Sequence, residues 1–336
     1  MDSTTKFVAD KETIAQMMEK AGLPAPEEVS SLDGGMFNSA YAVKAGGFQY
    51  VVKIAPPPGS KIGTYERDMM RQELFSYDIL REKTNIGLPA VYYRDTSRTF
   101  LPVDWFVMER LTAPRMQLDE LKLEGEEAAI AHRKVASLAA SYHRIAGTGY
   151  GYPQNGLFPK WSQAVKYIIL NLITDAERYG GDAPLAEECL FYAEKFSNVL
   201  DTAPCRYINY DLWENNMFYD RNENDGSDVP GRIYMIDPER FFWGDPIADM
   251  IFLDPMHIIL GEKKEALAGY NLTAEFPVDS ANREHQIRYY IPAAIYGALM
   301  QVERFERFTP GDEGWRMDLM GAKMFGETSL AELKKL

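Results

Sequence analysis

Two short segments are the most informative part of this 336-residue sequence: Asn209-Tyr210-Asp211-Leu212-Trp213-Glu214-Asn215-Asn216, and after it Ile236-Asp237-Pro238-Glu239-Arg240. It places an aspartate, an asparagine five residues later, and a second aspartate 21 residues after that asparagine. Phosphoryl transfer from a nucleotide needs one carboxylate to orient a hydroxyl, and an amide and a carboxylate to hold magnesium. Asp211, Asn216 and Asp237 therefore indicate a kinase.

The sequence around these residues predicts a β-hairpin. Two short apolar runs, 217–219 and 233–236, flank a polar segment, 220–231, that contains two Gly and one Pro. Antiparallel pairing would bring the two ends of the hairpin together, and with them Asn216 and Asp237. The alternative is that these Asp and Asn residues only form turns, as they often do. Spacing and flanking strands together favour the shared metal site.

This region resembles the aminoglycoside phosphotransferase family, relatives of choline kinases and protein kinases. The family signature reads H-G-D-L-x-x-x-N, then I-D-x-E-x-x-x-x-G-D-P-x-x-D. The matching residues here are Asp211, Leu212, Asn216, Ile236, Asp237, Glu239, Gly244, Asp245, Pro246 and Asp249. The resemblance implies that Asp211 is the catalytic aspartate and that Asn216 and Asp237 are the metal ligands. It implies structural roles for Asp245 and Asp249.

Two residues depart from the signature. The histidine of the family is Asn209 here, and the glycine after it is Tyr210. Asparagine can still form hydrogen bonds with the backbone, but it cannot titrate and lacks the imidazole ring. This departure motivates an alternative from another class, a nucleotide-binding pseudokinase.

The resemblance implies an α+β, bilobal, protein-kinase-like fold. A small N-terminal lobe with an antiparallel sheet, residues 1–110, would bind the nucleotide. A larger, mostly helical lobe, residues 111–336, would carry the catalytic and substrate-binding residues. Local patterns agree with this division. They predict strands at 40–44 and 48–54, joined by Ala45-Gly46-Gly47, and helices at 65–83, 126–145, 161–179, 185–200 and 283–308.

Lys53, within the β-branched run Tyr50-Val51-Val52-Lys53-Ile54, occupies the position of the family's phosphate-binding lysine. By itself, a strand lysine is commonly a solvated edge residue. Glu73, on the helix predicted at 65–83, is expected to pair with Lys53 and fix its ammonium group at the phosphates. Glu66 is the second candidate for this pairing.

Two backbone segments complete the expected nucleotide site. Asp33-Gly34-Gly35-Met36-Phe37-Asn38-Ser39 resembles the family's G-G-x-x-N loop, so Gly34, Gly35 and Asn38 are assigned to phosphate binding. The backbone of Glu109 and Leu111, at the end of an apolar strand, is expected to meet the adenine edge. The expected cofactors are ATP, with GTP as the other option, and Mg2+.

Composition and charge limit the function. Through Thr112 there are 13 Lys and Arg against 15 Asp and Glu, and the remainder holds 23 against 35. The excess acid in the expected substrate lobe suits a cationic acceptor, although acidic surfaces also simply keep proteins dispersed. The balance argues against nucleic acid as a partner. We expect no signal peptide, no membrane span and, with only two cysteines, a cytoplasmic protein.

The sequence therefore predicts a phosphotransferase that acts on a hydroxyl group of a small molecule, such as an aminoglycoside, an amino alcohol or another cationic metabolite. Trp213 also matches a tryptophan in the motif of fructosamine kinases, so a ketosamine is the main alternative acceptor. No H-x-x-x-H pair, C-x-x-C pair, G-x-S-x-G elbow or P-loop motif occurs. The acceptor and the oligomeric state are not readable from the sequence.

Overall fold

The computed structural model describes residues 5–32, 35, 37–116, 125–226, 231–253 and 264–336. The chain divides into two compact units. The first contains Met1–Ile62, Pro89–Thr112 and Glu306–Trp315, and the second contains Gly63–Leu88, Ala113–Phe305 and Arg316–Leu336. Residues 63–88 thus group with the second unit. A functional boundary between lobes at residue 110 stays a prediction.

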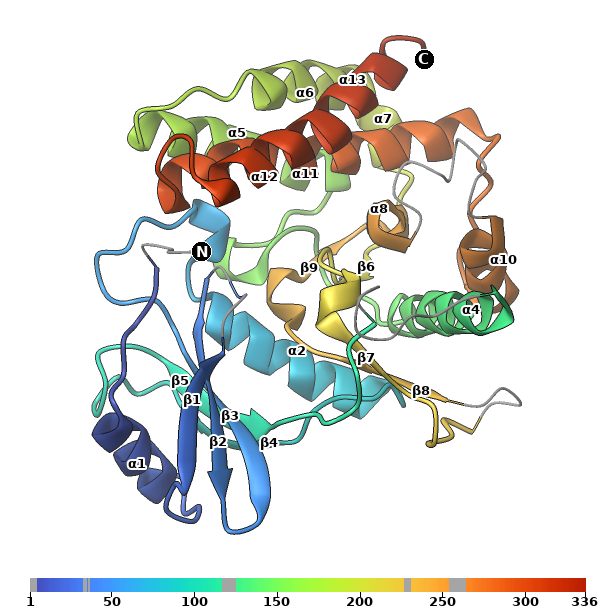
Figure 1. Ribbon diagram of the computed structural model, residues 1–336. Helices are drawn as coiled ribbons and strands as arrows, with labels where there is room; N and C mark the ends of the chain where they lie inside the picture. The colour runs from blue at the N-terminus through green and yellow to red at the C-terminus, as the bar shows by residue number, and fades with distance from the viewer. Residues whose placement is uncertain (1–4, 33–34, 36, 117–124, 227–230, 254–263) are drawn as a thin grey trace. The chain divides into compact units, whose positions relative to one another are not determined.

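The first unit is built on a five-stranded antiparallel sheet with the strand order β1-β2-β3-β5-β4 (Figure 1). Its strands are β1 (Glu28–Leu32), β2 (Ser39–Ala45), β3 (Phe48–Ile54), β4 (Val91–Asp95) and β5 (Trp105–Glu109). Gly46 and Gly47, with φ values of +57° and +80°, form the two-residue turn between β2 and β3. Hairpins favour such turns, and the predicted hairpin is confirmed.

Helix α1 (Lys11–Lys20) packs its apolar face into the core of the first unit. The helix begins after Asp10, whose carboxylate accepts a hydrogen bond of 2.8 Å from the Thr13 N–H. The core combines this helix with the inward face of the sheet. Its fully or nearly fully buried members include Ile14, Met17, Met18, Val43, Val52, Trp105 and Val107.

The segment ahead of α1 is held along residues 37–41 by hydrogen bonds. Their partners lie 32 residues further along the chain, so the two segments advance in the same direction. The bonds run from Thr5 Oγ1 to Phe37 O (2.9 Å), from Phe7 N to Ser39 Oγ (2.7 Å) and from Ala9 N to Tyr41 Oη (2.8 Å).

The second unit is mostly helical, which with the sheet of the first unit confirms the predicted α+β class (Figure 1). The predicted helices are found, and the one predicted at 185–200 is split in two at Phe196. The helices that lie wholly or mostly in this unit are α2 (Met69–Lys83), α4 (Gly125–Tyr142), α5 (Trp161–Arg178), α6 (Pro184–Lys195), α7 (Ser197–Leu200), α8 (Met250–Leu253), α10 (Lys264–Thr273), α11 (Arg283–Arg307), α12 (Glu313–Gly321) and α13 (Thr328–Leu333), with a π-helical stretch at Ala322–Glu327.

Helix α2 begins at Met69, four residues later than predicted. Asp68 has a φ of +52°, a left-handed conformation that an α-helix cannot contain. The preceding residues form the short 3-10 helix η1 (Thr64–Glu66), in which the Glu66 carboxylate accepts a hydrogen bond of 2.8 Å from the Gly63 N–H. Glu66 thus has a local capping role.

Two short antiparallel pairs complete the second unit. Strand β7 (Met217–Asp220) pairs with β8 (Arg232–Met235), with Met217 opposite Met235, so the hairpin predicted around the asparagine and the second aspartate is confirmed. Strand β6 (Arg206–Ile208) pairs with β9 (Phe242–Gly244). Across the residues that the structure describes, no helix is both long and apolar enough to cross a membrane.

Candidate active site

The loop between β6 and β7 carries the predicted catalytic aspartate. Asn216 closes this loop by donating from Nδ2 to the backbone oxygen of Asp211 (3.0 Å) and to its carboxylate Oδ2 (3.1 Å). The carbonyl of Asn216 accepts a hydrogen bond of 2.9 Å from the Ile236 N–H, directly before Asp237. The structure therefore brings Asp211, Asn216 and Asp237 together at the open end of the β7–β8 hairpin. Their chemical roles stay predictions.

A fully buried carboxylate fixes the backbone ahead of Asp211. Asp249 Oδ1 accepts a hydrogen bond from the Tyr210 N–H (2.7 Å), and Oδ2 accepts one from the Asn209 N–H (3.0 Å). The Tyr142 hydroxyl (2.7 Å) and His143 Nε2 (3.1 Å) also meet Oδ2. These contacts give Asp249 the structural role that the resemblance implies.

Both departures from the signature are accommodated. Asn209 Oδ1 accepts a hydrogen bond of 2.9 Å from the Asp211 N–H and so orients the start of the turn. Tyr210 has a φ of +58°, which glycine adopts easily and tyrosine rarely. Its ring is buried, and its hydroxyl donates to the Pro292 carbonyl (2.6 Å). These contacts hold a backbone conformation that costs about 1 kcal/mol.

The carboxylate of Asp211 lies among charged groups. Burial raises the pKa of Asp211 to about 7, the Arg240 guanidinium lowers it, and the carboxylates of Glu239 and Asp237 raise it. Arg240 Nε lies 3.9 Å from Asp211 Oδ2. A carboxylate with this proton affinity suits the acceptance of a proton from a hydroxyl group.

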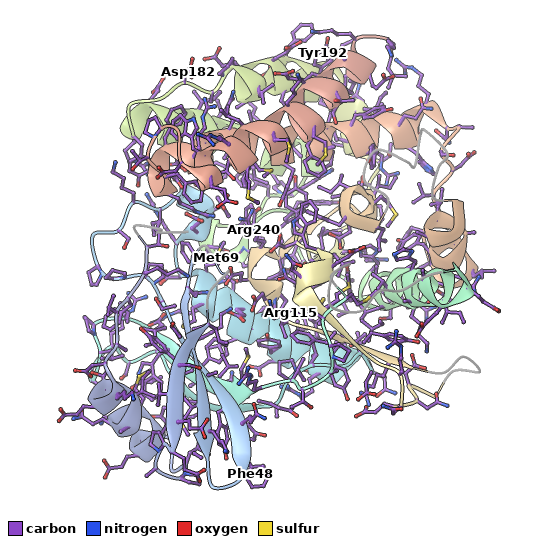
Figure 2. The ribbon with its side chains drawn as sticks, in the orientation of Figure 1. Phe48, Met69, Arg115, Asp182, Tyr192 and Arg240 are labelled. Carbon is purple, nitrogen blue, oxygen red and sulfur yellow. The ribbon has the colours of Figure 1, made fainter. Side chains whose placement is uncertain are left out.

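Arg240 belongs to this site, and the sequence reasoning missed it (Figure 2). It ends the 3-10 turn η4 (Pro238–Arg240), and its side chain is only 10% exposed. Nη2 donates to Glu303 Oε1 on α11 (3.0 Å), and the guanidinium carbon lies 5.7 Å from the centroid of the Tyr65 ring. Nη1 is buried and has no hydrogen-bond partner among the described residues. The only available signal was a cation directly after the two acids of the signature.

The glycine loop lies in the first unit, and Gly34 falls outside the described residues. Asn38 is buried, and its carbonyl accepts a hydrogen bond of 2.6 Å from Lys6 Nζ. A Cβ on Gly35 would lie 3.8 Å from the same ammonium group. Lys6 therefore adds a positive charge to the loop assigned to phosphate binding, which the sequence reasoning did not foresee.

Lys53 lies on β3, a central strand of the sheet, opposite Ala40 and Phe106. It is 5% exposed, and its ammonium group lies 5.9 Å from the centroid of the Phe106 ring. The reading of Lys53 as a solvated edge residue is therefore wrong. Glu73 is fully buried on α2. Because Lys53 belongs to the first unit and Glu73 to the second, their pairing stays a prediction.

Glu109 and Leu111, the residues assigned to the base, also belong to the first unit. The Glu109 N–H donates to the Ala90 carbonyl (2.8 Å), and the Glu109 carboxylate accepts a hydrogen bond from the Ala90 N–H (3.0 Å). The N–H of Glu109 is thus already committed within the sheet. The predicted contact with a base would therefore involve its carbonyl oxygen or the backbone of Leu111, just beyond β5, and it stays a prediction.

The donor atoms near Asp211 fit a magnesium ion that arrives with a nucleotide. Within the described ranges, no group of three or more His, Cys, Asp or Glu side chains could hold a metal ion by itself. Magnesium bound to a nucleotide needs only one or two protein ligands, because phosphate and water oxygens complete its shell. Asn216 uses its Nδ2 for Asp211, so its Oδ1 is the atom suited to a metal. Asp237 adds a carboxylate.

The profile of the phosphotransferase enzyme family matches residues 28–262 of this chain. Among curated sequences, none matches it significantly. Solved structures match over nearly its whole length. The structure of APH(2'')-IIIa in complex with GDP and kanamycin is 15% identical with a TM-score of 0.60, and the match covers 97% of this chain and 99% of that one.

Two further structures are similar to the same extent. A thermostable mutant of the aminoglycoside phosphotransferase APH(4)-Ia, in a ternary complex with ADP and hygromycin B, is 14% identical with a TM-score of 0.57, covering 94% of this chain and 97% of that one. A candidate fructosamine-3-kinase from Haemophilus somnus is 17% identical with a TM-score of 0.62, covering 95% and 96%. At these identities the likeness shows the fold.

Proposed function

Because the chain belongs to the phosphotransferase enzyme family, we propose that it transfers the γ-phosphate of ATP, or of GTP, to a hydroxyl group of a small molecule. The observation that carries this proposal is the hydrogen bond between Asn216 and the Asp211 carboxylate, at the end of the hairpin that also presents Asp237. An amide and two carboxylates in this arrangement match the needs of phosphoryl transfer.

Asp211 orients the acceptor hydroxyl and takes its proton. Its Oδ2 receives the hydrogen bond from Asn216 Nδ2 and faces Arg240 Nε, which leaves Oδ1 for the acceptor. A carboxylate positioned in this way turns the hydroxyl oxygen toward the phosphorus atom. Arg240, tied to Glu303, limits the rotation of the Asp211 side chain and thus acts as a positioning residue.

The remaining assigned residues bind the nucleotide. Asn216 Oδ1 and the Asp237 carboxylate would hold Mg2+, which neutralises charge on the phosphates when it is bound. The other members of the proposed site are Lys53, Glu73, Gly34, Gly35, Asn38, Glu109 and Leu111. In this assignment Lys53, held by Glu73, neutralises phosphate charge, the glycine loop donates N–H groups to phosphate, and Glu109 and Leu111 contact the base. The nucleotides in the structures of similar proteins, GDP and ADP, support this part of the proposal.

The acceptor is proposed to be a small cationic molecule with a free hydroxyl. Residues 113–336 carry 23 Lys and Arg against 35 Asp and Glu. A negative potential of this kind raises the local concentration of cations. Kanamycin and hygromycin B occur in the structures of similar proteins, which supports an aminoglycoside or a related amine as the acceptor.

A ketosamine is the second candidate acceptor. Trp213 stands two residues after Asp211, and its indole N–H donates to the Tyr296 hydroxyl on α11 (3.0 Å). Tyr296 is buried, and it holds the partly exposed Trp213 ring two residues from the catalytic carboxylate, where the indole could stack against a sugar ring or a cation. The similarity to the candidate fructosamine-3-kinase favours the same reading.

A pseudokinase is the alternative from another class, motivated by Asn209 and Tyr210. The hydrogen bond from the Asp211 N–H to Asn209 Oδ1 argues against it, because Asn209 still orients the catalytic turn. Binding of magnesium and ATP without transfer to any acceptor would favour the pseudokinase.

The test is an acceptor screen with the purified chain, Mg2+ and either ATP or GTP. Aminoglycosides, choline, amino alcohols and ketosamines are supplied singly, and nucleoside diphosphate release is followed in a coupled assay. We expect one class to raise the rate well above the rate without acceptor, and the Asp211→Asn variant to lose that increment. A wild-type chain that binds neither nucleotide would refute the proposal.

A further inference from the structure

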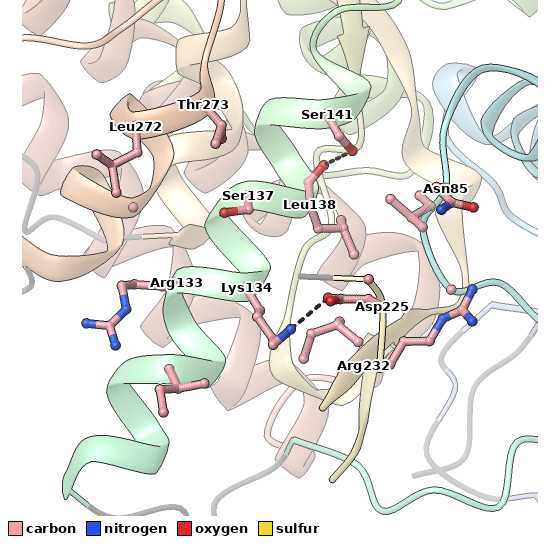
Figure 3. A pocket seen from close by; sticks show the side chains of 16 residues that line it. Asn85, Arg133, Lys134, Ser137, Leu138, Ser141, Asp225, Arg232, Leu272 and Thr273 are labelled. Atoms are coloured by element: carbon pink, nitrogen blue, oxygen red, sulfur yellow. Dashed lines mark hydrogen bonds and ion pairs between the residues drawn. The ribbon is translucent and has the colours of Figure 1, made fainter. Parts of the chain in front are cut away.

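A cavity of about 560 Å³ lies within the second unit and contains none of the residues assigned to phosphoryl transfer (Figure 3). Helix α4 forms one wall and helix α10 another, and the segment 85–87, residues 225–226 and the start of β8 supply the rest of the lining. This volume lies in the range of pockets that hold small molecules. The cavity is therefore large enough for a ligand of its own.

Two glycines give the walls their close spacing. A Cβ on Gly269 of α10 would lie 3.2 Å from the Cα of Arg133, so this glycine lets α10 lie tightly against α4. A Cβ on Gly87 would lie 2.5 Å from the carbonyl oxygen of Ile233. Gly87 also accepts a hydrogen bond of 3.0 Å from the Met235 N–H, which joins the segment 85–87 to strand β8. The walls are thus parts of packed structure.

The lining combines an apolar surface with an excess of positive charge. The apolar side chains are Ile86, Ile130, Leu138, Ile233 and Leu272, and the charged ones are Arg133, Lys134, Arg232 and Asp225. Lys134 Nζ and Asp225 Oδ2 form an ion pair of 2.7 Å, drawn as a dashed line in Figure 3. Two arginines then remain in excess, in a chain whose net charge is −14. Such local charge selects for an anion.

Arg232 is the better placed of the two arginines. Its side chain lines the cavity, is 31% exposed, and forms no hydrogen bond with the described residues. Its nearest counter-charge is Glu223, with 3.8 Å between Nη1 and Oε2, outside hydrogen-bond distance. Glu223 does not line the cavity, and its Oε2 accepts a hydrogen bond from the Tyr234 hydroxyl (2.5 Å). The accessible part of the guanidinium can therefore donate to a ligand oxygen in the cavity, and a charge-assisted hydrogen bond of this kind is among the stronger ones.

We propose that this cavity binds a small amphipathic anion, with an aliphatic or aromatic body between α4 and β8 and a carboxylate, sulfonate or phosphate group at Arg232. Leu272, 81% exposed on α10, extends the apolar surface at the cavity. This site is separate from the phosphotransferase reaction, so the inference does not rest on the function proposed above.

The probe is 8-anilinonaphthalene-1-sulfonate, which has an aromatic body and one anionic group and whose fluorescence rises in apolar surroundings. We expect saturable binding to the 336-residue chain at one site, with no displacement by ATP and Mg2+. Octanoate should displace the probe at a concentration at least tenfold lower than octylammonium does, because the two share an apolar body and differ in charge.

Two variants test whether the probe binds in this cavity. Ser137→Trp on α4 places an indole in the lining and should abolish binding, and Arg232→Gln should weaken it roughly tenfold through the loss of a charge-assisted hydrogen bond. The matched controls, Ser30→Trp on the exposed face of β1 and Arg67→Gln in an exposed turn, should bind as the wild type does. Thermal unfolding of each variant establishes that it is folded.

Several results would overturn the proposal. They are the absence of saturable binding, displacement of the probe by ATP and Mg2+, equal competition by octanoate and octylammonium, or unchanged binding in a folded Arg232→Gln variant. Should Ser137→Trp fail to fold, Arg232→Gln and the pair of charged competitors still decide the question.

Discussion

Replacement of Asp249 by asparagine should destabilise the second unit and distort the loop between β6 and β7 that carries Asp211. The two side chains have almost the same shape, so the change isolates charge and acceptor capacity. Asparagine keeps one acceptor oxygen, which can still serve the Tyr210 N–H. Its NH2 group would then face the donors that now meet Oδ2, among them the Asn209 N–H and the Tyr142 hydroxyl.

The magnitude follows from counting the affected bonds. The hydroxyl of Tyr142 can rotate, but the backbone N–H of Asn209 cannot, and it is fully buried beside a new donor. A stranded buried donor costs about 1–3 kcal/mol, and the loss of hydrogen bonds to a charged group costs about 1.5–3 kcal/mol. We expect a total near 3–4 kcal/mol, which corresponds to a shift of about 1 M in the urea midpoint.

Urea denaturation followed by tryptophan fluorescence measures this loss, and the acceptor-dependent rate measures the effect on the loop that carries Asp211. Asp279→Asn is the matched control, because that carboxylate is exposed and accepts a hydrogen bond of 2.9 Å from the Ala281 N–H. The control should stay within about 0.5 kcal/mol of the wild type. A loss below about 1 kcal/mol in Asp249→Asn, with an unchanged rate, would refute the view that this carboxylate supports the loop.

Asp211→Asn should remove at least 99% of transfer while nucleotide affinity, measured by calorimetry, stays within about threefold, since the carboxylate acts on the acceptor; comparable turnover would contradict the assignment. Asp237→Ala should instead weaken nucleotide binding at least tenfold when Mg2+ is present and have little effect when it is absent. Equal losses of affinity in the titrations with and without Mg2+ would argue against Asp237 as a metal ligand. Burial raises the pKa of the Cys205 thiol to about 11. At pH 8 this thiol should therefore react with iodoacetamide about a hundredfold more slowly than a thiol of pKa 9 does, because only the thiolate reacts. Its labelling rate should increase as the pH rises toward 11. Mass spectrometry at several pH values checks this, and rapid labelling at pH 8 would count against it. Gly87→Ala should destabilise the chain by about 2–3 kcal/mol in urea, because its Cβ would meet the Ile233 carbonyl at 2.5 Å, and a stable variant would be inconsistent with that contact.

Local patterns in the sequence were sufficient for the β2–β3 hairpin of the first unit and for the β7–β8 hairpin of the second, whereas strand β1 was not predicted. The Gly46-Gly47 turn, the β-branched strand around Lys53 and the apolar runs on either side of the 220–231 loop each carry their own signal. The start of α2 was misplaced because an ordinary aspartate, Asp68, adopts a left-handed conformation that no composition rule anticipates. Left-handed turn conformations could thus be predicted from the sequence where the residue is glycine, and not where it is aspartate.

Contacts between residues that are far apart in the chain could not be predicted from the sequence. Arg240 and Glu303 are 63 residues apart, and their ion pair depends on the placement of α11. The role of Asp249 follows from four donors on two segments, so the signature could imply a structural residue without naming its partners. Burial of Lys53 depends on its central strand, which the lysine itself does not encode. The cavity beside α4 arises from packing between elements, and no motif marks it.

The left-handed conformation at Tyr210 has an evolutionary consequence. Replacement of Tyr210 by glycine, the residue of the family signature, would relieve about 1 kcal/mol of backbone strain. It would also empty the space of a buried ring that packs against Phe242 and Tyr296 and remove the hydrogen bond to Pro292, at a cost of about 3–5 kcal/mol. A single substitution of Tyr210 by the glycine of the family signature is therefore expected to be destabilising. Glycine at position 210 would be tolerated only after substitutions to larger side chains at neighbouring positions had filled the volume of the tyrosine ring.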